Sequence, residues 1–219
     1  MEFEILDLGL VDFKKAWFFQ KEVLKAVRHG YLPAALIICR HYPVITLGRS
    51  ARKESILVSM DELKQKRIHF HEIERGGDVT YHGPGQLIVY PIFNLAYLKK
   101  DIHLFLRQLE ETVMGFFLGF GISASQRPGL TGVWMGRKKI ASIGIAIKNW
   151  VTFHGISINI KRNDLDNFCF IKPCGMEIEM TSLETILDKD IAIDQIKENL
   201  VNSFQNTFFM PHAQAFALS

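Results

Sequence analysis

The chain has 219 residues, of which 48% are hydrophobic and 22% are charged, the balance of an ordinary globular protein. This composition excludes a disordered chain, a collagen-like repeat and a coiled coil. At roughly 100–200 residues per domain, the length predicts one domain over residues 1–219. The 17 phenylalanines are enough for a sizeable core, and a net charge of +3 is too small to indicate a nucleic-acid partner.

The cysteines and the N-terminal residues bear on the cellular compartment. Three cysteines, an odd number, are not typical of a disulfide framework. Asp7 and Asp12 lie among the first apolar residues, where a signal peptide would have a basic start and an apolar centre. The sequence has no apolar run of about 18 residues, so we expect no membrane span. We therefore expect a cytoplasmic protein.

Apolar periodicity and turn residues predict a mixture of helices and strands. In chain order we expect a helix over 12–29, strands at 35–40 and 44–47, a short helix ending at 67, strands at 79–82 and 86–93, a helix over 101–120, strands at 133–135, 139–148 and 151–160, and a last helix over 193–208. Capping boxes at Ser59 with Glu62 and at Thr181 with Glu184 would start two of the helices. Without strict βαβ alternation, this order predicts a mixed or antiparallel sheet with helices packed on it.

The first segment that could carry chemistry is RGGDVTYHGPGQ, residues 75–86. Its four glycines allow tight turns and a close approach of the backbone to a ligand. Its Arg, Thr, Tyr and His side chains supply hydrogen-bond donors around that space. The segment matches neither of the glycine-rich phosphate loops, so it does not indicate a nucleotide site. The alternative is a hairpin with glycine-rich turns.

Two further segments contain a candidate lysine and a candidate cysteine. Lys139 stands at the head of an apolar strand, either as an edge lysine that reaches to solvent or as a partly desolvated ammonium. Cys174 lies between Pro173 and Gly175, which would hold its thiol in a fixed turn; it is either structural or a nucleophile. Cys39 lies at the end of an apolar strand and Cys169 lies between two phenylalanines, so both are expected to be small buried residues.

Metal and serine-hydrolase chemistry are the competing interpretations of these residue types. His69 and His71 alternate as in a strand, and Cys169 and Cys174 have a C-x4-C spacing, but neither a CxxC nor an HExxH pattern occurs. A Ser/His/Asp hydrolase would need a serine in a GxSxG-like elbow, which is absent. We expect no metal site and no cofactor.

With these segments in view, the sequence resembles the octanoyltransferases of lipoate biosynthesis, the lipoyl(octanoyl) transferase family. The resemblance rests on four motifs in the family's order and spacing: RGGDVTYHGPGQLIVYPI (75–92), GRKKIASIGI (136–145), WVTFHG (150–155) and IKPCGM (171–176). It implies an α/β (α+β) fold with a mixed, largely antiparallel sheet and flanking helices, like the catalytic domain of biotin and lipoate protein ligases.

The resemblance also implies a reaction and its residues. The octanoyl group would pass from octanoyl-acyl carrier protein, through a thioester on Cys174, to a lysine of a lipoyl domain. The acceptors would be the E2 subunits of 2-oxoacid dehydrogenases and the glycine cleavage H protein. Lys139 would lower the pKa of the cysteine; the doubled Lys138-Lys139 is a minor departure from the family's pattern. Substrate-binding residues carried over from the family are Arg75, Gly76, Gly77, Asp78, Val79, Thr80, Tyr81, His82, Ser142, Ile143, Gly144, Gly155, Ile156 and Ser157, and His154 is a further candidate for the lining of the site.

Strand alternation gives one more expectation for the two lysines. In a regular strand, Lys139 shares a face with Ile143 and Ile145, and Lys138 shares the other face with Ser142. We therefore expect Lys139 to be partly buried and Lys138 to face solvent, where it could meet an acidic carrier protein.

Two other functions remain open at this point. One is an ATP-dependent lipoate or biotin protein ligase on the same fold, which would form an acyl-adenylate. The other is a non-catalytic relative that binds carrier proteins, although binding alone requires neither Lys139 nor Cys174.

Overall fold

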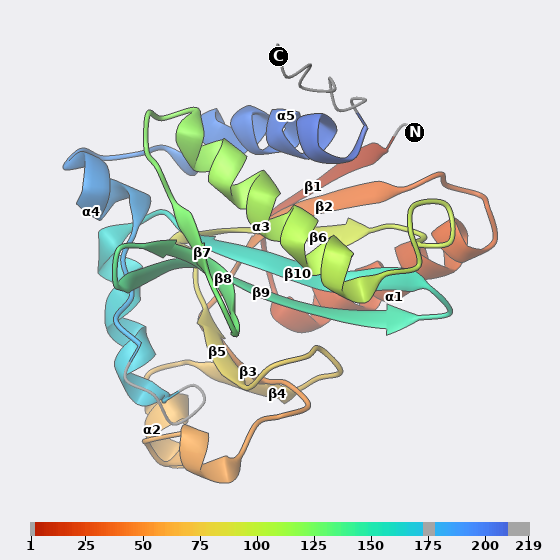
Figure 1. Ribbon diagram of the computed structural model, residues 1–219. Helices are drawn as coiled ribbons and strands as arrows, with labels where there is room; N and C mark the ends of the chain where they lie inside the picture. Colours follow the sequence, from red (N-terminus) through yellow and green to blue (C-terminus); the bar gives the residue numbers. More distant parts are fainter. Residues whose placement is uncertain (1–2, 173–177, 210–219) are drawn as a thin grey trace.

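The computed structural model describes residues 3–172 and 178–209. A seven-stranded sheet with the order β1-β2-β6-β10-β9-β8-β7 forms its centre (Figure 1). The strands are β1 (Glu4–Val11), β2 (Ala35–His41), β6 (Gln86–Ile92), β10 (Val151–Asn159), β9 (Lys138–Lys148), β8 (Leu130–Met135) and β7 (Ser125–Arg127). Strands β1 and β2 are parallel and all other neighbours antiparallel. The expected mixed, largely antiparallel sheet with flanking helices is confirmed.

Helices cover both faces of this sheet (Figure 1). The helices are α1 (Phe13–Arg28), α2 (Met60–Gln65), α3 (Ile102–Leu118), α4 (Leu183–Leu187) and α5 (Lys197–Phe208), with 3-10 helices η1 (Lys53–Ser55), η2 (Arg162–Phe170) and η4 (Ile193–Ile196). The core on one face includes Phe105 of α3 and Phe204 of α5, and the core on the other includes Val23 of α1. Burial on both faces explains why β6 is apolar along most of its length.

A second, three-stranded sheet lies below the large one (Figure 1). Its order is β4-β3-β5, with bounds His69–Glu72, Val44–Leu47 and Val79–His82. Its apolar side packs in a separate core with residues of α2 and η2. The sequence did not indicate that these strands form a sheet of their own, because periodicity shows which face of a strand is buried but not which strands are neighbours.

Three helix starts follow the local sequence, and a fourth departs from it. The Asp12 and Asp101 carboxylates accept the backbone N–H groups of Lys15 and Leu104, which starts α1 and α3 close to the expected positions. The expected Ser59 cap of α2 is confirmed, since its hydroxyl accepts the N–H of Glu62.

The expected capping box at Thr181 and Glu184 is wrong by one residue. Ser182 is the N-cap of α4 and accepts the N–H of Thr185. Thr181 instead donates its N–H to the carbonyl of Lys139, at 2.9 Å. Glu184 accepts from the backbone N–H of Arg162 and of Ile191 and from the ammonium of Lys161. Tertiary partners therefore bind the Thr181 backbone and the Glu184 side chain in place of the local cap.

Strands β1 and β7 were not expected, because β1 is half exposed and β7 has only 3 residues. Among the described helices, none is long and apolar enough to span a membrane.

Candidate functional site

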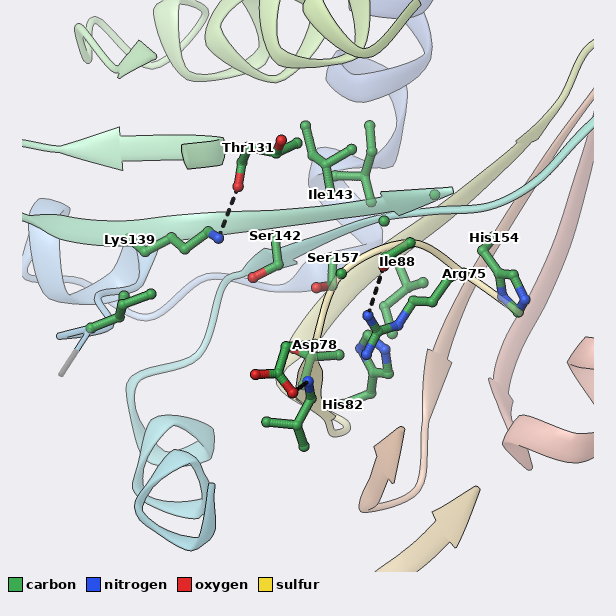
Figure 2. Close-up of a pocket in the computed structure, with 18 of the residues that line it drawn as sticks. Arg75, Asp78, His82, Ile88, Thr131, Lys139, Ser142, Ile143, His154 and Ser157 are labelled. Atoms are coloured by element: carbon green, nitrogen blue, oxygen red, sulfur yellow. Dashed lines mark hydrogen bonds between the residues drawn. The ribbon is translucent and has the colours of Figure 1, made fainter. Parts of the chain in front are cut away.

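A cavity of about 250 Å³ lies where β9 and β10 face the loop that leads into β5. Most of the residues proposed from the sequence line it: Arg75, Gly76, Gly77, Asp78, Val79, Thr80, His82, Lys139, Ser142, Ile143, Gly144, His154, Gly155, Ile156 and Ser157. Figure 2 shows Lys139 at one end of this group, Ser142 and Ser157 in the middle, and Arg75 and His154 at the other end. The structure thus brings three separate segments of the sequence to one cavity.

The loop before β5 is fixed to the small sheet by Arg75 and to the large sheet by Gly76. The Arg75 side chain is only 7% exposed, and its guanidinium donates to the backbone carbonyl of Thr46 at 2.8 Å. The N–H of Gly76 donates to the carbonyl of Ile145 at 2.8 Å. Burial lowers the pKa of Arg75 to about 10, so the guanidinium still carries its charge at neutral pH. Arg75 therefore places a positive charge at the cavity.

Two glycines make the close packing of this loop possible. Gly77 has φ +84°, in the region that favours glycine. A Cβ on Gly48 would come within 2.3 Å of the Gly77 carbonyl oxygen, so the two backbones are in direct contact. Next to them, Asp78 accepts the Ser55 hydroxyl at 3.1 Å and its own neighbouring N–H, that of Val79, at 2.7 Å. These contacts hold the Asp78 carboxylate at the cavity wall.

Buried histidines occupy the end of the cavity away from Lys139. His82 donates from Nδ1 to the Gln86 side-chain oxygen at 3.1 Å, and burial holds its pKa well below the ordinary value. His154 has φ +57°, and its backbone N–H donates to the Gln20 side chain at 2.8 Å. Burial also lowers the pKa of His154, although its Nε2 lies 3.4 Å from Glu74 Oε2. Both rings are therefore neutral at neutral pH.

His41 supports this end of the cavity from behind. It donates from Nδ1 to the Val11 carbonyl at 2.9 Å, so its Nε2 accepts the Tyr90 hydroxyl at 2.7 Å. Burial lowers the pKa of His41 to about 4. Tyr90 and Phe13 line the cavity beside it. Neither was proposed from the sequence, although Tyr90 lies within the first of the motifs that carry the family resemblance.

Lys139 lines the opposite end of the cavity. Its ammonium donates to the Thr131 carbonyl at 2.9 Å (Figure 2). The ammonium also lies 5.3 Å from the centre of the Trp134 ring. Lys139 is partly buried, whereas Lys138 is exposed and forms an ion pair with Glu179. The expected difference in exposure between the two lysines is confirmed.

The expected grouping of β9 side chains by face is wrong near its start. Lys139 pairs with Trp134 and Ala141 with Val133, so Ile140 is an extra residue in β9. Such a bulge lets two consecutive residues face the same side, and Ile140 and Ala141 both enter the core beneath α3. Lys139 therefore lies on the same face of β9 as Ser142 and not on the face of Ile143 and Ile145.

The segment that follows Cys174 reaches the same end of the cavity. Cys174 itself lies outside the described residues. Before it, the N–H of Lys172 donates to the Ser55 carbonyl at 2.8 Å; after it, Ile178 and Met180 line the cavity. Lys139 donates its N–H to the Glu179 carbonyl at 2.8 Å, so β9 is joined to the chain that follows Cys174.

The other two cysteines differ from each other. Cys39 is buried, as expected, and burial raises the pKa of its thiol above the ordinary value. The expectation that Cys169 is buried is wrong, because this residue is exposed on η2. Its apolar neighbours Phe168 and Phe170 pack against the core of the small sheet and leave the residue between them outside.

Tyr81 is the one described candidate that does not line the cavity. Its hydroxyl donates to Asp164 of η2 at 3.0 Å and accepts from the Asn167 amide at 2.9 Å. Alternation along β5 explains this, since Thr80 and His82 point to the cavity and Tyr81 points the opposite way.

Within the ranges 3–172 and 178–209, no group of three or more His, Cys, Asp or Glu residues is placed to hold a metal ion.

Comparisons with known proteins agree with this geometry. Residues 12–205 match the family model of the lipoyl protein ligase A/B catalytic domain. An octanoyltransferase of Thermoanaerobacter sp. is 42% identical over 208 residues, covering 94% of this chain and 90% of the relative. An octanoyltransferase of Syntrophotalea carbinolica is 38% identical over 218 residues, covering 98% and 100%.

Solved structures show the same fold at low sequence identity. A putative lipoate protein ligase of T. acidophilum with bound lipoic acid has a TM-score of 0.75 at 20% identity, covering 94% of this chain and 86% of that chain. The biotin protein ligase of Aquifex aeolicus in complex with biotin and ATP has a TM-score of 0.57 at 14% identity, covering 93% and 69%. The chain therefore belongs to the octanoyltransferases of the lipoyl protein ligase A/B family and is an acyltransferase.

Proposed function

We propose that this protein transfers an octanoyl group from octanoyl-acyl carrier protein to a lysine of a lipoyl domain, with Cys174 as the relay. The Cys174 thiolate attacks the thioester carbonyl, and the carrier thiol leaves with a proton from the Lys139 ammonium. The neutral amine of the acceptor lysine then attacks the new enzyme thioester, gives a proton to the neutral Lys139 and releases the Cys174 thiolate. A thioester and a thiol exchange at nearly equal energy, so a cysteine is a suitable relay.

The observation that carries this proposal is the position of Lys139. Its ammonium lies at the cavity, and both its backbone N–H and its carbonyl bind the chain that follows Cys174, through Glu179 and Thr181. A nearby cation stabilises a thiolate, and a neutral amine can accept the proton that the acceptor lysine loses. These roles fit one lysine that changes protonation during the cycle.

The rest of the cavity supports an acyl substrate. Ile88, Ile143, Ile156 and Met180 give it apolar walls, while Ser142, Ser157 and backbone groups offer hydrogen-bond partners. Gly144 and Gly155 are paired across β9 and β10, and a Cβ would come within 3.1 Å of the Gly76 carbonyl oxygen at Gly144 and within 2.3 Å of the Val89 carbonyl oxygen at Gly155, so both glycines let the backbone that borders the cavity pack closely. An eight-carbon chain needs such an apolar passage with few polar groups.

Acyl loading tests the relay directly. Octanoyl-acyl carrier protein alone is expected to add one octanoyl group to the wild-type enzyme in intact-mass spectra. Hydroxylamine should remove it, and Cys174→Ala should not be loaded. Full loading of Cys174→Ala would place the nucleophile elsewhere.

The two adjacent lysines give a matched pair for the second step. Lys139→Ala should lower the rate of transfer by about 100-fold or more and raise the pH at which Cys174 reacts with iodoacetamide. Lys138→Ala should leave that pH profile unchanged, because Lys138 is exposed and paired with Glu179. The reverse pattern would contradict the role given to Lys139.

An ATP requirement separates the proposal from ligase chemistry. Transfer from the carrier protein to a lipoyl domain is expected to continue after apyrase removes nucleotide. If transfer stops with apyrase and resumes on addition of ATP, the ligase interpretation is correct instead.

A further inference from the structure

We propose that Glu110, on α3, is a positioning residue that holds the Lys139 ammonium at the cavity through a single peptide group. Glu110 belongs to none of the motifs that carry the resemblance, and it does not line the cavity. The inference rests on the proposed function only for the role of Lys139, because the contact between the two residues is independent of the reaction.

The connecting group is the peptide between Thr131 and Gly132 at the start of β8. Its N–H donates to Glu110 Oε1 at 2.8 Å. Its carbonyl, which belongs to Thr131, accepts from the Lys139 ammonium at 2.9 Å (Figure 2). The carboxylate and the ammonium therefore bind opposite ends of the same amide dipole.

Gly132 leaves this peptide little freedom to move. Its φ of +130° lies in the region that favours glycine. A Cβ at this position would come within 2.5 Å of Lys139 Cε and 2.7 Å of the Ala141 carbonyl oxygen. The Lys139 side chain thus packs directly on the peptide that holds it.

The burial of Glu110 is unusual for a carboxyl group. Its side chain has no exposed surface, and of its neighbours one turn along the helix, Val113 is a core residue and Met114 packs against the core. Burial raises the pKa of Glu110, whereas the Gly132 N–H, Arg107 and Lys139 oppose that rise. An apolar side chain would pack there without desolvating a charge, so the carboxylate points to a role beyond packing.

Other charged groups around the pair come from several elements. On α3, Arg107 lies 2.5 Å from Glu110 Oε2, and Glu111 is exposed on the adjacent position. On β7, the Arg127 guanidinium lies 4.6 Å from the centre of the same Trp134 ring that Lys139 contacts. On β9, Lys138 is paired with Glu179. The Arg127 and Lys139 cations thus both lie near the Trp134 ring. Glu110 supplies a negative charge that is linked to Lys139 through the Thr131–Gly132 peptide.

The physical effect of this arrangement is twofold. A carboxylate that accepts from an amide N–H polarises the amide and makes its carbonyl a stronger acceptor. The ammonium form of Lys139 is then stabilised, and its Nζ is fixed where the chain around Cys174 passes. Two variants separate the effect of the Glu110 charge from that of its hydrogen bond. Glu110→Gln removes the charge and keeps an acceptor for the Gly132 N–H, whereas Glu110→Ala removes both.

The test is an NMR titration of Lys139 in full-length enzyme labelled at lysine Cε, with its signal assigned from Lys139→Arg. We expect Glu110→Gln to lower the pKa of Lys139 by about half a unit or more. The matched control, Glu111→Gln, removes the same charge from the next, exposed residue and should leave the titration unchanged. A titration that is identical in both variants would overturn the proposal.

Transfer kinetics give the second readout. In Glu110→Ala the octanoyl-transfer kcat should fall about 10-fold or more with little change in KM, and in Glu110→Gln it should fall less. A loss of activity without any shift of the Lys139 titration would show a merely structural role and overturn the proposal. If the titration shifts as expected but wild-type enzyme transfers no octanoyl group, the positioning role stands and the proposed function fails.

Discussion

The segment 75–86 divides into two groups of residues that contact different parts of the molecule. Arg75 to Thr80, together with His82, lines the cavity. Tyr81, Gly83 and Gly85 instead contact Asp164 at the start of η2, the 3-10 helix that precedes Cys174 in the sequence. The first group forms the wall of the site, and the second anchors the chain that leads to the proposed nucleophile.

The glycines show this difference most clearly. A Cβ on Gly76 would meet only the Ile145 carbonyl oxygen, at an ordinary distance of 3.6 Å. A Cβ on Gly85 would lie 2.6 Å from Asp164 Cβ and 2.7 Å from Lys161 Cβ. Identical residues in one motif are therefore required for different reasons: Gly76 keeps the cavity open, and Gly85 allows two segments of backbone to pack together.

The pH response of the two groups also differs in sign. The cavity group packs against buried neutral histidines, whose pKa values are lowered. The anchoring group surrounds Asp164, whose pKa is raised because burial outweighs its hydrogen bonds to Tyr81 and Gly85. Protonation of the histidines at low pH therefore destabilises the folded cavity. Protonation of Asp164 removes a buried charge and stabilises its surroundings.

The largest effect on stability is expected from the acid titration of His41. Its folded pKa of about 4 lies below its unfolded value of about 6.5, so stability is complete above pH 6.5 and is lost as the pH falls toward 4. The loss should reach about 3 kcal/mol in urea unfolding at pH 4 compared with pH 7.5. His41→Gln should show a smaller loss over this range, and His103→Gln, which changes an exposed residue of α3, should behave like wild type. An equal acid loss in His41→Gln would assign the effect to other groups.

Gly85→Ala should have the next largest effect. The new methyl group would clash with Asp164 and Lys161, which costs about 1–3 kcal/mol when a packed region must shift. Urea unfolding at pH 7.5 measures it. Because η2 must move, octanoyl loading of Cys174 should also slow. Unchanged stability would mean that the anchoring contact is less tight than these distances indicate.

Asp164→Asn should change stability by about 1 kcal/mol or less at neutral pH. The amide has one acceptor oxygen for the two donors, Tyr81 and Gly85, but it also avoids the cost of a buried charge. In wild type, the raised pKa means that the Asp164 contribution is present at low pH and is lost as the pH rises through the folded pKa. The fall in stability from pH 7.5 to pH 3.5, to which His41 contributes most, should therefore be larger in Asp164→Asn than in wild type; an equal fall in both would argue against the assignment.

Gly76→Ala should have the smallest effect on stability, within about 0.5 kcal/mol, because its methyl group meets no close atom. Its consequence should be functional, since the methyl group is added at the cavity wall. We expect octanoyl loading to slow several-fold while the melting temperature stays near that of wild type. A large fall in melting temperature would erase the distinction between the two glycines.

The sequence by itself determined most of the local structure and the membership of the site. Apolar periodicity and caps such as Asp12 and Ser59 act over a few residues, so the main helices and central strands could be predicted close to their bounds. The resembling motifs also predicted that three distant segments form one site, and the described members except Tyr81 line one cavity. Tyr81 could have been separated from Thr80 and His82 by strand alternation alone.

Only the tertiary structure decided how these elements act together. The bulge at Ile140, which brings Lys139 to the face of Ser142, depends on the pairing of β9 with β8, and no short sequence pattern encodes it. The exposure of Cys169 and the cap at Ser182 likewise follow from partners distant in the sequence. The contact of Glu110 with Lys139 through the Thr131–Gly132 peptide joins three elements. The local sequence determines which backbone conformations have a low free energy. The fold supplies the burial and the hydrogen-bond partners, which fix the final position of each functional group.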